Sequence, residues 1–279
     1  MSLTAYNGVS IPSFMYGTAW KKEATSRLVQ QAVAAGFTAI DTANQIIHYQ
    51  EALVGEALLA LAEQGFARDR LFLQTKFTPA NGQDHRTPYD PSAELTTQVN
   101  QSFDSSLHHL HTDQVNSYVL HGPYQRWGLG KADREVWAAI EALYESGRTR
   151  MIGISNVAAG QLTELCDHAK HKPMVVQNRC YAALCWDKEV RDICRAHSII
   201  YQGFSLLTAN RDVLADQTVR AIAQRLGTGV AQVIFCFALQ IGMLPLTGTT
   251  NPNHMKEDLA AVRLTLSEED MRYIETVGM

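Results

Sequence analysis

Short apolar runs alternate along the chain with longer segments in which apolar residues recur every three or four positions. The short runs have the length of strands, and the longer segments have the spacing of amphipathic helices. The predicted strands are residues 13–18, 37–41, 71–77, 117–121, 151–156, 174–177, 199–204 and 243–246. The predicted helices are residues 23–35, 50–63, 92–109, 133–146, 213–226, 229–240, 254–262 and 267–277.

This alternation of strand and helix predicts a (β/α)8 TIM barrel with extra helices. Asn7-Gly8 stands between short apolar pieces and predicts a two-residue β-hairpin within residues 3–12, lying across the bottom of the barrel. No linker or low-complexity segment interrupts the 279 residues, so residues 1–279 are expected to form a single domain. Residues 78–91 form a long polar loop, which is typical of functional or mobile segments.

Polar side chains stand where the predicted strands end. Three successive strands end on Asp41, Lys76 and His121, and the others end on or beside Ser155 with Asn156, Gln177, Ser205 and Thr247. The carboxyl ends of the strands in a parallel barrel form one face, so these residues predict a polar pocket there. A buried lysine is costly unless a carboxylate pairs with it, and Asp41 is the expected partner of Lys76.

Composition excludes several other classes of function. The net charge of −4 argues against a nucleic-acid partner. No apolar run is long enough to cross a bilayer, and the N-terminus has no secretory signal, so we expect a cytoplasmic protein without a membrane partner. The five cysteines have no metal-ligand spacing, which predicts reduced thiols and no metal site.

Five motifs resemble, in order, those of the aldo-keto reductases. They are Gly36-Phe-Thr-Ala-Ile-Asp-Thr-Ala43, Thr75-Lys-Phe77, Leu120-His-Gly-Pro123, Ile152-Gly-Ile-Ser-Asn156 and Gly203-Phe-Ser-Leu-Leu207. The resemblance covers nearly the whole chain, from Tyr16 to about Leu264. It implies reduction of aldehyde or ketone carbonyls to alcohols with hydride from NADPH, or from NADH, on a small-molecule substrate. We expect a monomer or a weak homodimer.

The family's catalytic tetrad of Asp, Tyr, Lys and His maps in three positions, to Asp41, Lys76 and His121. The tyrosine does not map. The family usually places it five residues after the aspartate, where this chain has Ile46. Counting back from Glu51 and Gly55 reaches His48, because the loop from Asp41 is two residues longer than usual.

Tyr49 is the only tyrosine within reach of this position, and we assign it as the proton donor, with His48 as the alternative. A carbonyl that receives hydride becomes an alkoxide, which a positioned acid must protonate. A free phenol has a pKa near 10, and we expect Lys76 beside it to lower that pKa. His121, as a neutral imidazole, is expected to orient the carbonyl oxygen.

The resemblance also implies a cofactor site at the other strand ends. Ser155, Asn156 and Gln177 would hold the nicotinamide amide, and Phe204 would stack on the ring where the family usually has tyrosine. Ser205 and Leu207 would line the path of the pyrophosphate.

The adenosine end of that site departs most from the family pattern. Gly248 and His254 stand where many relatives have the Lys and Arg that bind the 2′-phosphate of NADPH, and Asp258 replaces the usual Asn near adenine. Thr249, Thr250 and the amides at a helix N-terminus remain to receive a phosphate. We therefore expect NADPH to be preferred only weakly over NADH.

Trp20, Tyr124 and Trp127 are the substrate-side candidates. Two rival functions remain. The longer tyrosine loop and the missing phosphate cations fit a nicotinamide-binding regulatory subunit with little turnover. A Schiff-base aldolase would use Lys76 as nucleophile, but such a lysine must be neutral, and pairing with Asp41 opposes that.

Overall fold

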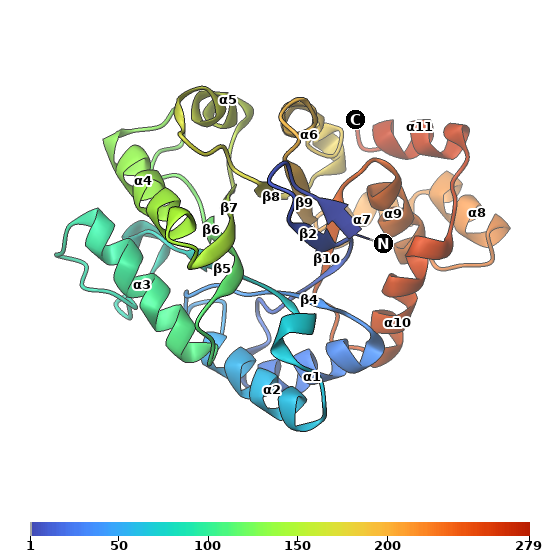
Figure 1. Cartoon of the computed structure of the whole chain (residues 1–279). Coiled ribbons are helices and arrows are strands. Elements are labelled where there is room, and N and C mark those ends of the chain that lie inside the picture. Colours follow the sequence, from blue (N-terminus) through green and yellow to red (C-terminus); the bar gives the residue numbers. More distant parts are fainter. Residues whose placement is uncertain (1) are drawn as a thin grey trace.

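Eight parallel strands close into a barrel in the order β10-β3-β4-β5-β6-β7-β8-β9. The computed structural model describes residues 2–279, and Figure 1 shows the helices in a ring around the strands. The predicted TIM barrel is confirmed. The barrel strands are β3 (Met15–Gly17), β4 (Ala39–Asp41), β5 (Phe72–Phe77), β6 (Val115–Leu120), β7 (Thr149–Ser155), β8 (Val175–Arg179), β9 (Ile200–Phe204) and β10 (Leu244–Thr247).

The helices follow the strands and cover the outside of the barrel. They are α1 (Thr25–Ala35), α2 (Glu51–Glu63), α3 (Leu95–His109), α4 (Lys131–Glu145), α5 (Ala159–His168), α6 (Lys188–Ala196), α7 (Arg211–Ala215), α8 (Gln217–Arg225), α9 (Val230–Gln240), α10 (Pro252–Ala260) and α11 (Glu268–Thr276). The hydrophobic pattern gave no separate range for α5 or α6. Both are short, with only about one apolar turn each, although their few apolar residues do recur at helical spacing.

The predicted helix 213–226 is two helices, α7 and α8, separated at Asp216. This residue is extended, with φ −60° and ψ 135°, and its carboxylate accepts a hydrogen bond from the Val219 amide. An aspartate that caps the first turn of a new helix in this way ends the previous one.

The N-terminal hairpin is confirmed, but its turn differs from the prediction. Strands β1 (Ser2–Thr4) and β2 (Ser10–Pro12) pair antiparallel, and the Ala5 amide bonds the Val9 carbonyl, so the loop has three residues. Gly8 has φ +81°, the left-handed conformation that closes such loops. The Tyr6 hydroxyl bonds the Lys172 carbonyl, which attaches the loop near the start of β8, at the bottom of the barrel.

The long loop after β5 packs on the same end of the barrel as the strand termini. The Tyr89 hydroxyl donates to the Thr78 carbonyl at 2.8 Å, and the Tyr89 ring lies 5.5 Å from that of Phe77. Within residues 2–279, no single helix is long and apolar enough to cross a membrane; only α8 and α9 taken together, bent by 89°, meet that length and composition.

Candidate active site

Asp41 and Lys76 form a buried ion pair at the carboxyl ends of β4 and β5. Lys76 is fully buried, and its Nζ donates to Asp41 Oδ1 and Oδ2, both at 2.7 Å, and to the Thr42 carbonyl at 2.8 Å. Burial lowers the pKa of Lys76 from its usual value, and the Asp41 carboxylate opposes that shift. The pairing expected from the sequence is therefore present.

The loop after β4 brings Tyr49 to this pair. The Tyr49 ring centroid lies 5.2 Å from Lys76 Nζ, and the ring meets that of His121 edge-on at 5.8 Å. His48 points elsewhere: its Nδ1 lies 2.6 Å from Gln45 Oε1, and its ring packs on Trp20 at 4.1 Å. Ile46 is partly exposed to solvent.

The environment of the Tyr49 hydroxyl differs from the expectation in one respect. Its removal from water, together with the Asp41 charge, raises the pKa of Tyr49 well above the usual value, whereas we expected Lys76 to lower it. Burial is the larger cause, and the three N–H groups of Lys76 all go to Asp41 and Thr42, so none of them reaches the phenol. In the described part of the chain, the Tyr49 hydroxyl makes no hydrogen bond.

His121 follows β6 and faces the same space. Burial lowers the pKa of His121 well below its usual value, and the nearby Lys76 charge adds to that effect. The imidazole is therefore neutral at pH 7, as expected. Its Nδ1 lies 2.7 Å from the Thr78 hydroxyl, and its backbone carbonyl accepts from the Asn156 side chain at 2.8 Å.

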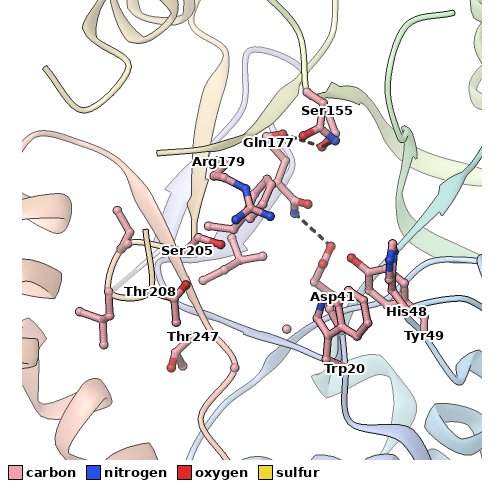
Figure 2. Close-up of a pocket in the computed structure, with 18 of the residues that line it drawn as sticks. Trp20, Asp41, His48, Tyr49, Ser155, Gln177, Arg179, Ser205, Thr208 and Thr247 are labelled. Atoms are coloured by element: carbon pink, nitrogen blue, oxygen red, sulfur yellow. Dashed lines mark hydrogen bonds between the residues drawn. The ribbon is translucent and has the colours of Figure 1, made fainter. Parts of the chain in front are cut away.

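A cleft of about 790 Å³ opens over these residues. Figure 2 shows His48, Tyr49 and Trp20 on one side of it and Arg179, Ser205 and Thr247 on the other. The predicted site residues that line it are Trp20, Asp41, Tyr49, His121, Ser155, Asn156, Gln177, Phe204, Ser205, Leu207, Gly248, Thr249, His254 and Asp258. Lys76 lies beneath the cleft, and Thr250, Tyr124 and Trp127 do not line it, with Trp127 73% exposed.

The expected nicotinamide site presents hydrogen-bond acceptors to the cleft. Gln177 uses its two N–H groups on Asp41 Oδ1 at 3.1 Å and Gln202 Oε1 at 3.0 Å, which leaves its own Oε1 free. Asn156 likewise donates to the His121 carbonyl and to Ser155 Oγ. The free oxygens suit the amide N–H groups of a nicotinamide, so this end of the cleft fits that group.

The next part of the cleft holds a flat apolar surface and an unpredicted cation. Arg179 lies two residues after Gln177 on β8, so both side chains face the same way. Its guanidinium carbon is 5.4 Å from the centroid of the Phe204 ring. Of the described residues that line the cleft, Arg179 is the only lysine or arginine.

The far end of the cleft, by α10, carries carboxylates. Burial raises the pKa of Asp258 to about 6, although its Oδ2 accepts from the Thr247 hydroxyl at 2.7 Å. Glu257 and His254 also line this end. The Lys21 ammonium donates to the Gly248 carbonyl, so a cation from the loop after β3 lies beside the position where relatives carry their lysine.

Within residues 2–279, no three His, Cys, Asp or Glu side chains are placed to hold a metal ion. The five cysteines are unpaired.

Comparison with a family model shows which family the chain belongs to. Residues 13–278 match the model described as the aldo/keto reductase family. The chain belongs to the aldo-keto reductases. This aldo-keto reductase is 32% identical to a glyoxal reductase of Bacillus subtilis (strain 168), over 98% of this chain and 91% of the relative.

Two solved structures share the fold of this aldo-keto reductase. One, an aldo/keto reductase from Brucella melitensis, superposes with a TM-score of 0.86 at 27% identity, over 100% of this chain and 98% of the other. The second is an aldo-keto reductase in complex with NADPH. It has a TM-score of 0.86 at 22% identity, with 100% of this chain and 88% of the other covered.

Proposed function

We propose that this oxidoreductase reduces the carbonyl group of small aldehydes or ketones to an alcohol. The observation that carries the proposal is the Tyr49 ring beside the buried Asp41–Lys76 pair, with neutral His121 at its edge. A reduced nicotinamide cofactor, when bound, supplies the hydride. The remaining steps belong to side chains of this chain.

Tyr49 gives its hydroxyl proton to the developing alkoxide oxygen, because its ring lies in the cleft 5.2 Å from Lys76 Nζ. The Lys76 ammonium stabilises the phenolate that remains, and Asp41 keeps that ammonium charged and in place. His121 donates an N–H to the carbonyl oxygen and so fixes its direction toward Tyr49.

The opposite side of the cleft fits the cofactor. The acceptor oxygens of Gln177 and Asn156 suit the nicotinamide amide, and the Phe204 ring offers a face for stacking. Arg179, which lines the cleft, and Lys21, which lies beside Gly248, are the cations we assign to the diphosphate. The NADPH named in the structural neighbour supports the same cofactor class, with NADH as the second candidate.

The substrate pocket is the part of the cleft beside Trp20, which is 66% exposed at its rim. The glyoxal reductase relative suggests short aldehydes, and the exposed indole suggests aromatic ones. We therefore choose a panel of both kinds, together with simple ketones.

The test is the loss of NADPH absorbance with this panel. We expect turnover with at least one aldehyde. Binding of NADPH without any turnover, including in a single-turnover experiment with bound cofactor, would contradict the proposal and favour the regulatory subunit. The longer loop and the unbonded Tyr49 hydroxyl are the observations that favour this second candidate.

A further inference from the structure

Two buried glutamines that the proposed reaction does not use lie beside Asp41 inside the barrel. Gln74 precedes Lys76 by two residues on β5, so both side chains face the barrel interior. The register places Gln74 opposite Asp41 and Gln202 opposite Gln177. Both glutamines are 0% exposed. Branched apolar residues usually fill the layers of side chains inside a TIM barrel, so two glutamines there are unusual.

The amides of Gln74 and Gln202 bond each other in both directions. Gln74 Nε2 donates to Gln202 Oε1 at 2.8 Å, and Gln202 Nε2 donates to Gln74 Oε1 at 3.0 Å. This pair fixes the orientation of the Gln74 amide, whose other N–H donates to Asp41 Oδ1 at 2.8 Å. Gln177 donates to the same oxygen, as Figure 2 shows.

The two oxygens of Asp41 are therefore not equivalent. Oδ1 accepts from Gln74, Gln177 and Lys76, whereas Lys76 is the one donor to Oδ2 within residues 2–279. The Lys76 ammonium has three hydrogens, and all three are in use. Lys76 can donate a hydrogen bond to the Tyr49 oxygen only if one of these three hydrogens leaves its present acceptor. The hydrogen bond from Lys76 to Asp41 Oδ1 is the one that can be lost most easily, because Oδ1 still accepts from Gln74 and Gln177.

We propose that Gln74 is a positioning residue for the proton transfer. It holds Asp41 Oδ1, with its own amide held by Gln202, so that Lys76 can release this oxygen and turn one N–H toward the Tyr49 hydroxyl. Lys76 then stays paired with Oδ2 and with the Thr42 carbonyl. In this exchange a hydrogen bond changes its acceptor and no proton is transferred. The inference rests on the proposed function.

Gln74→Met and Gln202→Met form a matched pair of variants. Each replaces a glutamine by an unbranched side chain of similar volume, and each destroys the mutual amide pair. Only Gln74→Met also removes an N–H from Asp41, whereas Gln202→Met also removes the acceptor of one Gln177 N–H. We expect Gln74→Met to lower kcat about tenfold, the scale of one hydrogen bond to a charged group, and Gln202→Met to lower it less than about threefold.

The pH profile separates positioning from packing. Tyr49 acts as an acid, so kcat falls as the pH rises through its apparent pKa, and contact with Lys76 lowers that pKa. The fall should move to higher pH in Gln74→Met and stay in place in Gln202→Met. The Kd for NADPH, read from tryptophan fluorescence, should change less than about threefold in Gln74→Met, since Gln74 does not line the cleft and makes no hydrogen bond to Gln177.

Equal losses of kcat in the two variants, or an unmoved profile in Gln74→Met, would overturn the inference while the proposed function stands. A wild-type protein that binds NADPH but reduces no carbonyl would overturn both. If Gln74→Met fails to fold, the double variant Gln74→Leu/Gln202→Leu takes its place, because it leaves neither amide unpaired. It must show the same loss and the same shift, or the inference fails.

Discussion

The source of the proton depends on which side chain of the loop after β4 meets Lys76. Tyr49 has its ring beside the ammonium, whereas His48 is engaged with Gln45 and Trp20. We expect Tyr49→Phe to lower kcat by about 10² to 10⁴, the usual worth of general acid catalysis, with NADPH binding nearly unchanged. Steady-state kinetics and a fluorescence titration measure the two effects.

His48→Gln is the matched control for that variant, because it changes the adjacent residue of the same loop. The pKa of His48 is lowered by burial, so its imidazole is a neutral and weak donor at pH 7. We expect a loss of less than about tenfold in kcat. The reverse order of the two losses would make His48 the proton donor.

The buried carboxyl group of Asp258 leads to a second prediction, on the pH dependence of stability. Burial raises its pKa to about 6, above the value of 3.8 for a free aspartate. Below about pH 4 the carboxyl group of Asp258 is protonated, and burial of a charge costs no stability. The free-energy cost of burying the charged carboxylate grows as the pH rises through 6. Asp258→Asn keeps an acceptor for Thr247 and should increase the free energy of unfolding at pH 8 by up to about 3 kcal/mol relative to pH 4.

Urea unfolding of Asp258→Asn and the wild type at pH 4 and pH 8 measures this difference. Glu257→Gln provides the comparison, because it removes an exposed carboxylate from the same helix. Its effect should be smaller than that of Asp258→Asn at pH 8, because Glu257 is exposed and adds only a minor part to the raised pKa of Asp258. A gain for Asp258→Asn that is already present at pH 4 would show that ionisation of Asp258 is not the cause.

At the scale of elements, the start of α10 decides how the cofactor's adenosine end is held. The cleft there is lined by Glu257, Asp258 and His254, without lysine or arginine. We expect NADPH to be preferred over NADH by less than about a thousandfold, or about 4 kcal/mol. Titration of tryptophan fluorescence with each cofactor gives the ratio of the two Kd values.

His254 is exposed in the first turn of α10, so His254→Arg places a permanent cation there. It should tighten NADPH about tenfold and leave NADH unchanged, because only NADPH carries the 2′-phosphate. Equal effects on both cofactors would place the phosphate elsewhere. The cation would then act on the diphosphate that both share.

Hydrophobic periodicity predicts some of the helices well and misses others. Helix α4 buries a full apolar face, from Val136 to Leu143, and its spacing predicted it. Helix α6 has Val190, Ile193 and Cys194 at helical spacing, but it has only nine residues and is mostly polar, so no separate range was predicted for it. The break between α7 and α8 depends on one hydrogen bond to Asp216, which no periodicity contains.

At the scale of the whole molecule, the cleft joins residues from β3 to β10, so a bound cofactor connects elements from both ends of the chain. A ligand that binds only the folded state adds about 2.7 kcal/mol at a hundred times its Kd. For a chain of this size we expect NADPH to raise Tm by several degrees, at about 2 to 4 °C per kcal/mol. Thermal unfolding with and without NADPH measures this rise.

Two aromatic variants control that measurement. Phe204→Ala removes a ring from the cleft wall and should reduce the rise in Tm, whereas Trp127→Phe changes a ring outside the cleft and should leave it unchanged. A rise that is equal in all three proteins would mean that NADPH binds at another surface.

The sequence by itself determined the barrel, the family and the strand ends that carry Asp41, Lys76 and His121. These features are local: the alternation of apolar runs and the residue that ends each run can be read within a few positions. The cleft position of Gln177 and Phe204 followed from the same strand ends.

Only the tertiary structure decided which side chains meet across the barrel. Gln74 and Gln202 are 128 residues apart in sequence, yet their amides are paired. Tyr49 and His48 are neighbours in one loop, and only the packing of that loop turns the first toward Lys76 and the second toward Trp20. Arg179 is distinguished by its place in the cleft, beside the ring of Phe204. Such contacts depend on strand register and on loop packing, which join distant parts of the chain and leave no periodic trace in the sequence.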